Sequence, residues 1–215
     1  MNAAVCGQGA EVRSRETMDI QSRIAGILAA EAAAIAAVRV TPAFEQAVLA
    51  LRDSKGKVLT TGMGKAGHVA RKFASTLCST GTPAIYVHPG ESAHGDLGLI
   101  GRGDCIVAFS TSGKTREVLE MLQRGRQLGL GTIVGVTSHP DSELRTLSDI
   151  VVDMGLITEP CPHGLTPSSS IAVMLAISDA IALVLMELKQ FSPADFGLRH
   201  HGGYLGTQAR VGPKQ

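Results

Sequence analysis

Six consecutive residues near the middle of the chain combine four hydroxyls with a lysine. They follow the apolar run Cys105–Phe109 and precede residues 116–123, whose apolar positions have helical spacing. A turn between a strand and the start of a helix presents free backbone N–H groups and a positive dipole end to an anion. The stretch predicts a phosphate-binding turn, although the same hydroxyls would also serve as ordinary helix caps. The residues assigned to this contact are Ser110, Thr111, Ser112, Lys114 and Thr115.

A second turn is rich in glycine. Gly62-Met-Gly64-Lys65-Ala-Gly67 fits the G-x-G-x-x-G fingerprint of dinucleotide-binding proteins. That fingerprint also requires an acidic residue at the end of the next strand, and here that strand leads into His88 instead. A nicotinamide cofactor is therefore not expected. We interpret the turn as a place where the backbone of Gly62 and Gly64 approaches a ligand, with Lys65 adding charge.

A third turn, Ser168-Ser169-Ser170, opens the most apolar segment of the chain and has more hydroxyls than a cap requires. Gly113-Lys114-Thr115 resembles the end of a P-loop, but Ala108 stands where that motif needs its first glycine, so a nucleoside triphosphate is not expected. Ligands of open α/β sheets bind at the carboxyl ends of the strands. We therefore expect the three turns to face one crevice.

These turns must be positioned by alternating strands and helices. Short continuous apolar strands separated by helices indicate a parallel sheet covered on both faces, which is an α/β fold. One domain is expected over residues 16–206, with a disordered tail at 1–15 and a second tail at 207–215. The predicted strands cover residues 57–61, 84–87, 105–109, 132–137 and 150–153, and the predicted helices cover 18–40, 42–53, 68–79, 115–128, 142–148 and 168–190.

Composition narrows the class of protein. A net charge of +1 over 215 residues gives no electrostatic reason to expect nucleic acid or an anionic membrane as a partner. The four cysteines form no CxxC pair, which favours reduced thiols in a cytoplasmic protein, and no signal peptide is read. Residues 171–186 are strongly apolar but shorter than the roughly 20 residues of a membrane span, so they are interpreted as a buried helix.

Several longer strings resemble a known family. They are Thr61-Gly-Met-Gly-Lys-Ala-Gly-His68, Val87-His-Pro-Gly-Glu-Ser-Ala-His-Gly-Asp-Leu-Gly98, Glu159-Pro-Cys-Pro-His-Gly-Leu-Thr-Pro-Ser-Ser-Ser170 and Asp195-Phe-Gly-Leu-Arg-His-His-Gly-Gly-Tyr-Leu-Gly206. The chain resembles sugar isomerase (SIS) domain proteins over residues 18–206, and within them the arabinose 5-phosphate isomerases. The pair of CBS domains that commonly follows in that family is not expected within these 215 residues.

The resemblance implies a three-layer sandwich with a five-stranded parallel sheet, and a homo-oligomer, expected to be a tetramer, with active sites between subunits. It implies that the hydroxyls at 110–115 and at 168–170 hold a sugar phosphate and that no organic cofactor is required. Lys65, Glu159 and His200 occupy the family's lysine, glutamate and C-terminal histidine positions. His88 and His94 fall where family members bind metal, which makes them candidates for incidental zinc.

The sequence also departs from the family pattern. Lys114 stands where the family usually has a glutamate, so the charge inside the expected site is reversed. His201 replaces a proline and His163 replaces a leucine. Because of Lys114 in particular, the sequence does not determine which sugar carries the phosphate.

The expected chemistry is the interconversion of an aldose and a ketose phosphate. This reaction moves one proton between C1 and C2 and another between the two oxygens. The hypothesis makes Glu159 the base through a cis-enediol, with its pKa raised by burial. His200 would open the sugar ring or move the hydroxyl proton, with His201 an equal candidate, and Lys65 would stabilise the enediolate oxygen. Arabinose 5-phosphate and ribulose 5-phosphate are the expected substrates; the alternatives are another phosphosugar and a non-catalytic sugar-phosphate-binding module.

Overall fold

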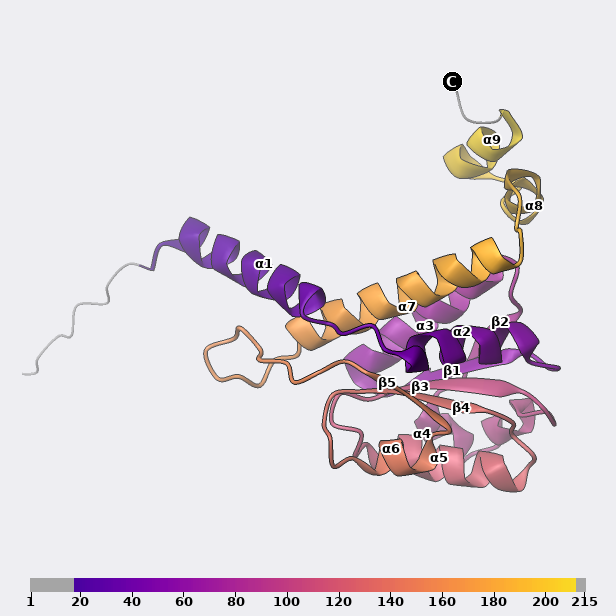
Figure 1. Ribbon diagram of the computed structural model, residues 1–215, viewed down its shortest axis with the longest axis horizontal. Helices are drawn as coiled ribbons and strands as arrows, with labels where there is room; N and C mark the ends of the chain where they lie inside the picture. Colours follow the sequence, from indigo (N-terminus) through magenta and orange to yellow (C-terminus); the bar gives the residue numbers. More distant parts are fainter. Residues whose placement is uncertain (1–17, 212–215) are drawn as a thin grey trace, which may run out of the picture.

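Within residues 18–211, which the computed structural model describes, five strands form one parallel sheet in the order β2-β1-β3-β4-β5 (Figure 1). All five predicted strands are confirmed, each to within one residue at either end. The expected tail at residues 1–15 lies outside the described residues. The strands are β1 (Val58–Gly62), β2 (Ala84–Tyr86), β3 (Cys105–Phe109), β4 (Ile133–Thr137) and β5 (Ile150–Asp153).

Helices cover both faces of this sheet and create two apolar cores. Successive residues of a strand point to opposite faces, so Val107 of β3 packs in a core with α2, α3 and α7, whereas its neighbour Ile106 packs in a core with α5 and α6. Figure 1 shows these two groups of helices on opposite sides of the strands. The predicted three-layer α/β fold is therefore confirmed. The helices are α2 (Pro42–Asp53), α3 (Gly64–Ser79), α5 (Arg116–Gln127), α6 (Glu143–Leu147) and α7 (Ser169–Leu188).

Two predicted connections contain regular structure. Helix α3 begins at Gly64, four residues before the expected start at His68, because Gly64 adopts a φ of +57° and lets the chain turn directly from β1 into the helix. The loop expected at residues 88–98 contains a short helix α4 (Pro89–Ser92), capped by His88, and a 3₁₀ turn (Asp96–Leu99). Both changes concern segments near the carboxyl ends of β1 and β2.

Helix α7 confirms the helix predicted over residues 168–190 to within two residues at either end, and it is longer than its strongly apolar part at residues 171–186. It runs for 20 residues, so its length and composition alone would allow it to cross a membrane. The expectation that it is too short is therefore corrected. The helix nevertheless has a buried face, including Val173, Ile177 and Ile181, that packs in the same core as α2 and α3. A core helix passes the same length and composition test, so one such helix is weak evidence for a span.

Three helices extend beyond the sandwich (Figure 1). Helix α1 (Ile20–Ala36) projects from one end of α7, and the pair α8 (Pro193–Arg199) and α9 (Gly203–Val211) lies beyond the other end. Helix α1 ends at Ala36 rather than at residue 40. Pro42 opens α2 and restricts Thr41 before it to an extended conformation. Helix α9 continues past Gly206, so residues 207–211 of the expected tail are helical.

Candidate active site

The glycine-rich turn and the hydroxyl-rich loop lie side by side at one edge of the sheet. Gly62, the last residue of β1, pairs with Phe109, the last residue of β3, and Phe109 pairs in turn with Val136 near the end of β4. In a parallel sheet the segments that follow these residues leave from the same edge. The structure thus brings Gly62 and Gly64 next to the loop at residues 110–115, as the sequence predicted.

The hydroxyl-rich loop is closed by its own side chains. The Ser110 hydroxyl lies 2.8 Å from the Thr115 hydroxyl and accepts a hydrogen bond from the Gly113 N–H at 3.0 Å. The Ser112 hydroxyl accepts the Lys114 N–H at 3.2 Å. Ser110 is buried, Thr111 and Ser112 are half-buried, and Lys114 is exposed. The loop is therefore a preformed turn before α5 that offers hydroxyls and one cation to a ligand.

Two residues near the end of β4 support this loop and were not singled out in the sequence. The Thr137 hydroxyl and the Ser138 N–H both donate to the carbonyl oxygen of Thr111, at 3.3 and 3.1 Å. Gly113 adopts a φ of +62°, and a Cβ atom added there would lie 2.3 Å from the Ser142 hydroxyl. The sequence signal that could have found Thr137 and Ser138 was their position, because hydroxyls at the carboxyl end of a parallel strand lie at the same edge of the sheet as the candidate site.

The Glu159 carboxylate lies at the N-terminus of α7. Its Oε2 accepts the backbone N–H groups of Ser168 and Ser169, each at 2.8 Å, and its Oε1 accepts the N–H of Ser170 at 3.2 Å. These are donors that the first turn of a helix leaves without an intrahelical partner. An acidic side chain here is further stabilised by the helix dipole.

This contact reverses the expected pKa shift. Burial by itself raises the pKa of Glu159, but the interactions with Ser170 and with the N–H groups of Ser168 and Ser169 outweigh burial, and the pKa lies below its ordinary value. The expectation of a raised pKa is therefore wrong. The physical reason is that the fold supplies three hydrogen-bond donors to the charged form.

The three serines hold Glu159 through their backbone N–H groups. Their N–H groups are occupied by Glu159, and the hydroxyl of Ser169 is buried with no hydrogen-bond partner among the described residues. A contact of Ser168, Ser169 or Ser170 with a phosphate stays a prediction.

Lys65 is exposed on the first turn of α3, close to the start of α7. Together with His68, Lys72 and Ile171 it borders a surface hollow of about 290 Å³. Ile171 directly follows Ser170, whose N–H group donates to Glu159. The first turn of α3, which carries Lys65, therefore lies beside the N-terminus of α7, where Glu159 is bound. Two of the three predicted catalytic residues therefore belong to one region of the chain.

His200 does not join them within one chain. It lies at the end of α8, where its ring stacks on Phe196 at a centroid distance of 3.8 Å and its Nδ1 lies 3.0 Å from the Phe196 carbonyl oxygen. Glu159 contacts the first turn of α7, whereas α8 follows the last turn, and a helix of 20 residues is about 30 Å long. The choice between His200 and the exposed His201 stays open.

The two candidate metal ligands lie on the short helix after β2. His88 caps α4 by accepting the Glu91 N–H at its Nδ1, at 3.4 Å, and His94 is exposed just beyond that helix. Among residues 18–211 there is no group of three or more His, Cys, Asp or Glu side chains that could hold a metal ion. Zinc binding by His88 and His94 stays a prediction.

The sequence profile of the SIS domain matches residues 50–184, which is more than half of the chain. The protein belongs to the SIS domain family. This SIS domain chain is 41% identical over 170 residues to the arabinose 5-phosphate isomerase KdsD of Pseudomonas aeruginosa, an alignment that covers 79% of this chain and 52% of that protein. The chain spans about half the length of the curated relatives it matches.

Solved structures of similar proteins have the same fold. A protein from Escherichia coli CFT073 in complex with arabinose 5-phosphate is 38% identical with a TM-score of 0.80, covering 85% of this chain and 97% of that one. A candidate phosphosugar isomerase involved in capsule formation from Bacteroides fragilis is 40% identical with a TM-score of 0.82, covering 86% and 98%. These similarities extend over almost the whole of the described fold.

Proposed function

We propose that this SIS domain interconverts an aldose phosphate and a ketose phosphate, with D-arabinose 5-phosphate and D-ribulose 5-phosphate as the substrate pair. The observation that carries the proposal is the Glu159 carboxylate, which is held in its charged form by three N–H groups at the start of α7. The similarity to an arabinose 5-phosphate isomerase and to a structure with bound arabinose 5-phosphate supports the choice of substrate.

In this proposal the sugar phosphate binds with its phosphate on the loop at residues 110–115. Glu159 removes the proton from C2 of the open-chain aldose, which gives an enediolate, and the resulting carboxylic acid returns a proton to C1. A second proton moves from O2 to O1, so that the ketose forms without gain or loss of atoms. Lys65 stabilises the negative oxygen of the intermediate.

The remaining proton transfer and the opening of the ring are assigned to His200 of a second copy of the chain. Because about 30 Å of α7 separates Glu159 from the α8 region of the same chain, one chain alone does not bring these groups together. The proposal therefore includes a homo-oligomer, a tetramer in the simplest form, with active sites between subunits.

The proposed reaction needs no organic cofactor, and zinc at His88 and His94 is proposed to be incidental. We also place the activity in the cytoplasm, since Cys78, Cys105 and Cys161 are free thiols, as is usual in a reducing compartment. No nucleic acid or membrane partner is part of the proposal.

A second candidate is an isomerase for a different phosphosugar. It is favoured by Lys114, an exposed cation inside the hydroxyl-rich loop where the family usually has a glutamate. The change Lys114→Glu distinguishes the two. If it creates or raises turnover of arabinose 5-phosphate at the expense of another sugar, the lysine has redirected selectivity.

A coupled assay against a panel of aldose and ketose phosphates tests the proposal. The purified chain is expected to turn over arabinose 5-phosphate, and Glu159→Gln is expected to abolish most of this activity. Saturable binding of the phosphosugars with no turnover of any of them would contradict an enzyme and indicate a sugar-phosphate-binding module instead.

A further inference from the structure

A side chain of α1 fixes the backbone next to Glu159. The guanidinium group of Arg23 donates a hydrogen bond to the carbonyl oxygen of Pro160, the residue that directly follows Glu159. Arg23 is half-buried, and 137 positions separate it from Pro160 in the sequence. The contact therefore joins α1 to the connection between β5 and α7, which carries the proposed base.

Pro160 transmits the position of its carbonyl group to Glu159. The proline ring fixes φ of Pro160 at about −65°, and its bulk restricts Glu159 before it to an extended conformation. A rotation that would absorb a shift between the Glu159 Cα atom and the Pro160 carbonyl carbon is therefore not freely available. A displacement of the Pro160 carbonyl group moves the Glu159 backbone with it.

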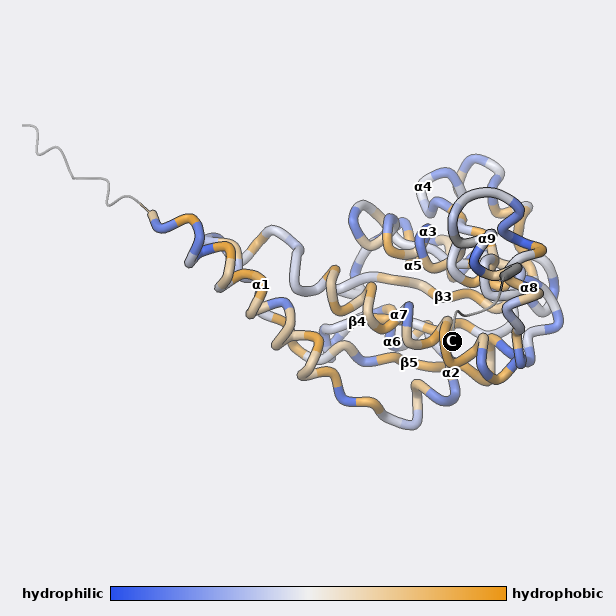
Figure 2. Tube along the Cα trace, turned by 90° about the horizontal axis from the view of Figure 1, so that it is seen from above, coloured by the Kyte–Doolittle hydropathy of each residue, from blue (hydrophilic) through white to orange (hydrophobic). Residues whose placement is uncertain are grey.

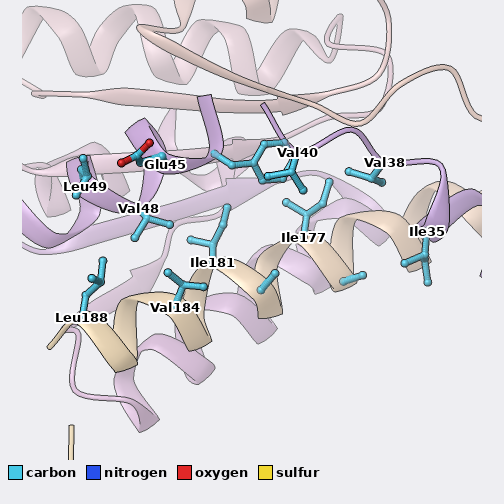
Figure 3. Close-up of a pocket in the computed structure, with 13 residues that line it drawn as sticks. Ile35, Val38, Val40, Glu45, Val48, Leu49, Ile177, Ile181, Val184 and Leu188 are labelled. Atoms are coloured by element: carbon cyan, nitrogen blue, oxygen red, sulfur yellow. The ribbon is translucent and has the colours of Figure 1, made fainter. Parts of the chain in front are cut away.

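Helix α1 is a rigid support for this contact. Figure 2 shows it as an arm that extends from one end of the sandwich. The base of the arm is anchored, because Ile35 in the last turn of α1 and Val38 just beyond it line an apolar groove along α7, together with Ile177 (Figure 3). Arg23 lies about 18 Å along the helix from Ile35. A helix that is anchored at Ile35 therefore holds Arg23 in a defined position.

Arg23 bridges a gap between α1 and the connection. The two segments border a groove of about 690 Å³, and α1 contributes Ala30 and Ala34 to its wall. Alanine has no polar side-chain atoms and cannot hold the opposite wall by hydrogen bonds. Among residues 18–211, Arg23 supplies the one side-chain hydrogen bond from α1 to residues 154–168. Loss of the Arg23 contact therefore removes the polar attachment of the connection to α1.

We propose that Arg23 is a positioning residue for Glu159: it holds the Pro160 carbonyl group, and thereby keeps the carboxylate where it can remove the C2 proton of the sugar phosphate. Glu159 is then held at two points, its carboxylate by N–H groups of α7 and its backbone by α1. Rates fall about 100-fold when a reacting group is misplaced by about 1 Å, so the second point of attachment affects the reaction. This inference rests on the proposed function.

Arg23 acts through position and not through charge. It contacts a neutral carbonyl group, and the groups that lower the pKa of Glu159 are Ser168, Ser169 and Ser170. Removal of the arginine should therefore slow the transfer of the C2 proton without shifting the pH dependence of kcat. KM should change little, because the phosphate loop at residues 110–115 keeps its own contacts.

Steady-state kinetics on the full chain, with arabinose 5-phosphate carrying protium or deuterium at C2, test the proposal. Arg23→Ala is expected to lower kcat about tenfold and to change KM less than about twofold. The deuterium isotope effect on kcat is expected to rise toward its full value, because removal of the C2 proton becomes slower relative to the other steps. The matched control is Arg39→Ala, which removes an arginine that lines the same groove. It should leave kcat and the isotope effect at their wild-type values.

Guanidinium ion separates the lost contact from a general disturbance. At millimolar concentration it is expected to restore part of the kcat of Arg23→Ala, because it can occupy the space of the missing side chain, and to leave Arg39→Ala unchanged. Arg23→Gln, which keeps the stem of the side chain and favours a helix as arginine does, is the second variant if Arg23→Ala fails to fold. It should lose kcat in the same way, with the wild-type mass in light scattering.

Amide hydrogen exchange measures the attachment without any turnover. Peptides from residues 155–167 should exchange faster in Arg23→Ala than in either wild type or Arg39→Ala. Wild-type kcat in folded Arg23→Ala and Arg23→Gln, a smaller isotope effect, an equal loss in Arg39→Ala, a loss that accompanies a lower mass, or unchanged exchange would each overturn the proposal. A wild type that converts no phosphosugar would instead contradict the proposed function, and the exchange comparison would still decide whether Arg23 holds the connection.

Discussion

The Oε2 atom of Glu159 lies 2.8 Å from the backbone nitrogen of Ser169, the first residue of α7. Ser168 and Ser170 donate to the same carboxylate. Glu159, the proposed catalytic base, is therefore an anion bound at the N-terminus of the apolar helix α7. Its charge state and its position both depend on that helix.

Glu159→Gln is expected to lower kcat about 10²- to 10⁴-fold, which is the usual contribution of a general base. KM should change little, because the phosphate loop at residues 110–115 is untouched. The measurement is a steady-state assay with arabinose 5-phosphate, with circular dichroism as the control for folding. Wild-type kcat in this variant would show that another group removes the C2 proton.

The pH dependence should carry the signature of a lowered pKa. Because the pKa of Glu159 lies below the ordinary value of 4.5, the carboxylate stays charged throughout the neutral range, and any limb of the kcat profile between pH 5 and 8 belongs to another group.

The charged form of Glu159 adds stability above the unfolded-state pKa, and this contribution is lost as pH falls through the lower folded-state pKa. Thermal unfolding of wild type and Glu159→Gln from pH 7 to 3 should therefore show a difference that narrows below pH 4.5. A difference that already narrows between pH 7 and 6 would contradict the lowered pKa.

Gly113→Ala is expected to damage the hydroxyl-rich loop. The added Cβ would meet the Ser142 hydroxyl at 2.3 Å, in a backbone conformation of φ +62° that side chains disfavour. The free energy of unfolding should fall by about 1–3 kcal/mol, and binding of inorganic phosphate should weaken. Gly26→Ala in α1 is the matched control, because its added Cβ would meet no atom within 4 Å beyond its chain neighbours and the adjacent helix backbone, and this change should stabilise slightly. Equal effects of the two changes would contradict a structural role for Gly113.

Lys114→Ala is expected to weaken phosphosugar binding about two- to fivefold, since an exposed charge contributes up to about 1 kcal/mol. The effect should shrink as salt is added, because exposed charges are screened. The measurement is KM at low and at high ionic strength. Lys55→Ala removes an equally exposed charge in the connection before β1 and should leave KM unchanged. A KM change shared by both variants would assign the effect to net charge rather than to the loop.

Treatment with a chelator is expected to leave kcat unchanged, because no step of the proposed reaction passes through a metal. Zinc titration of wild type and of His88→Ala with His94→Ala measures whether these residues bind the ion at all. Loss of activity on chelation, restored by zinc, would overturn the proposal that the metal is incidental.

Much of the fold could be predicted from local patterns. A strand such as Cys105–Phe109 is apolar at every position because it is buried on both faces of a parallel sheet, and this is visible in five letters of sequence. The hydroxyl-rich turn that follows it was equally visible, since the carboxyl end of a parallel strand is where such a turn faces a ligand. The family strings added the roles of Lys65, Glu159 and His200.

Other features depend on contacts between residues far apart in the sequence. The direction of the Glu159 pKa shift was predicted wrongly, because burial and the donors of α7 oppose each other and only the folded geometry shows that the donors outweigh burial. The contact of Gly113 with Ser142 joins two loops that no local pattern relates.

The largest of these features is the separation of the catalytic candidates. By sequence alone, Glu159 and His200 were members of one predicted site. In the tertiary structure they lie near opposite ends of α7, because a continuous helix of 20 residues is rigid and holds its two ends about 30 Å apart. The sequence by itself determined the sheet, its turns and the residue types for the chemistry, since these depend on local periodicity. Which of those residues meet within one chain was decided only by the tertiary structure, because it depends on the length and packing of the helices between them.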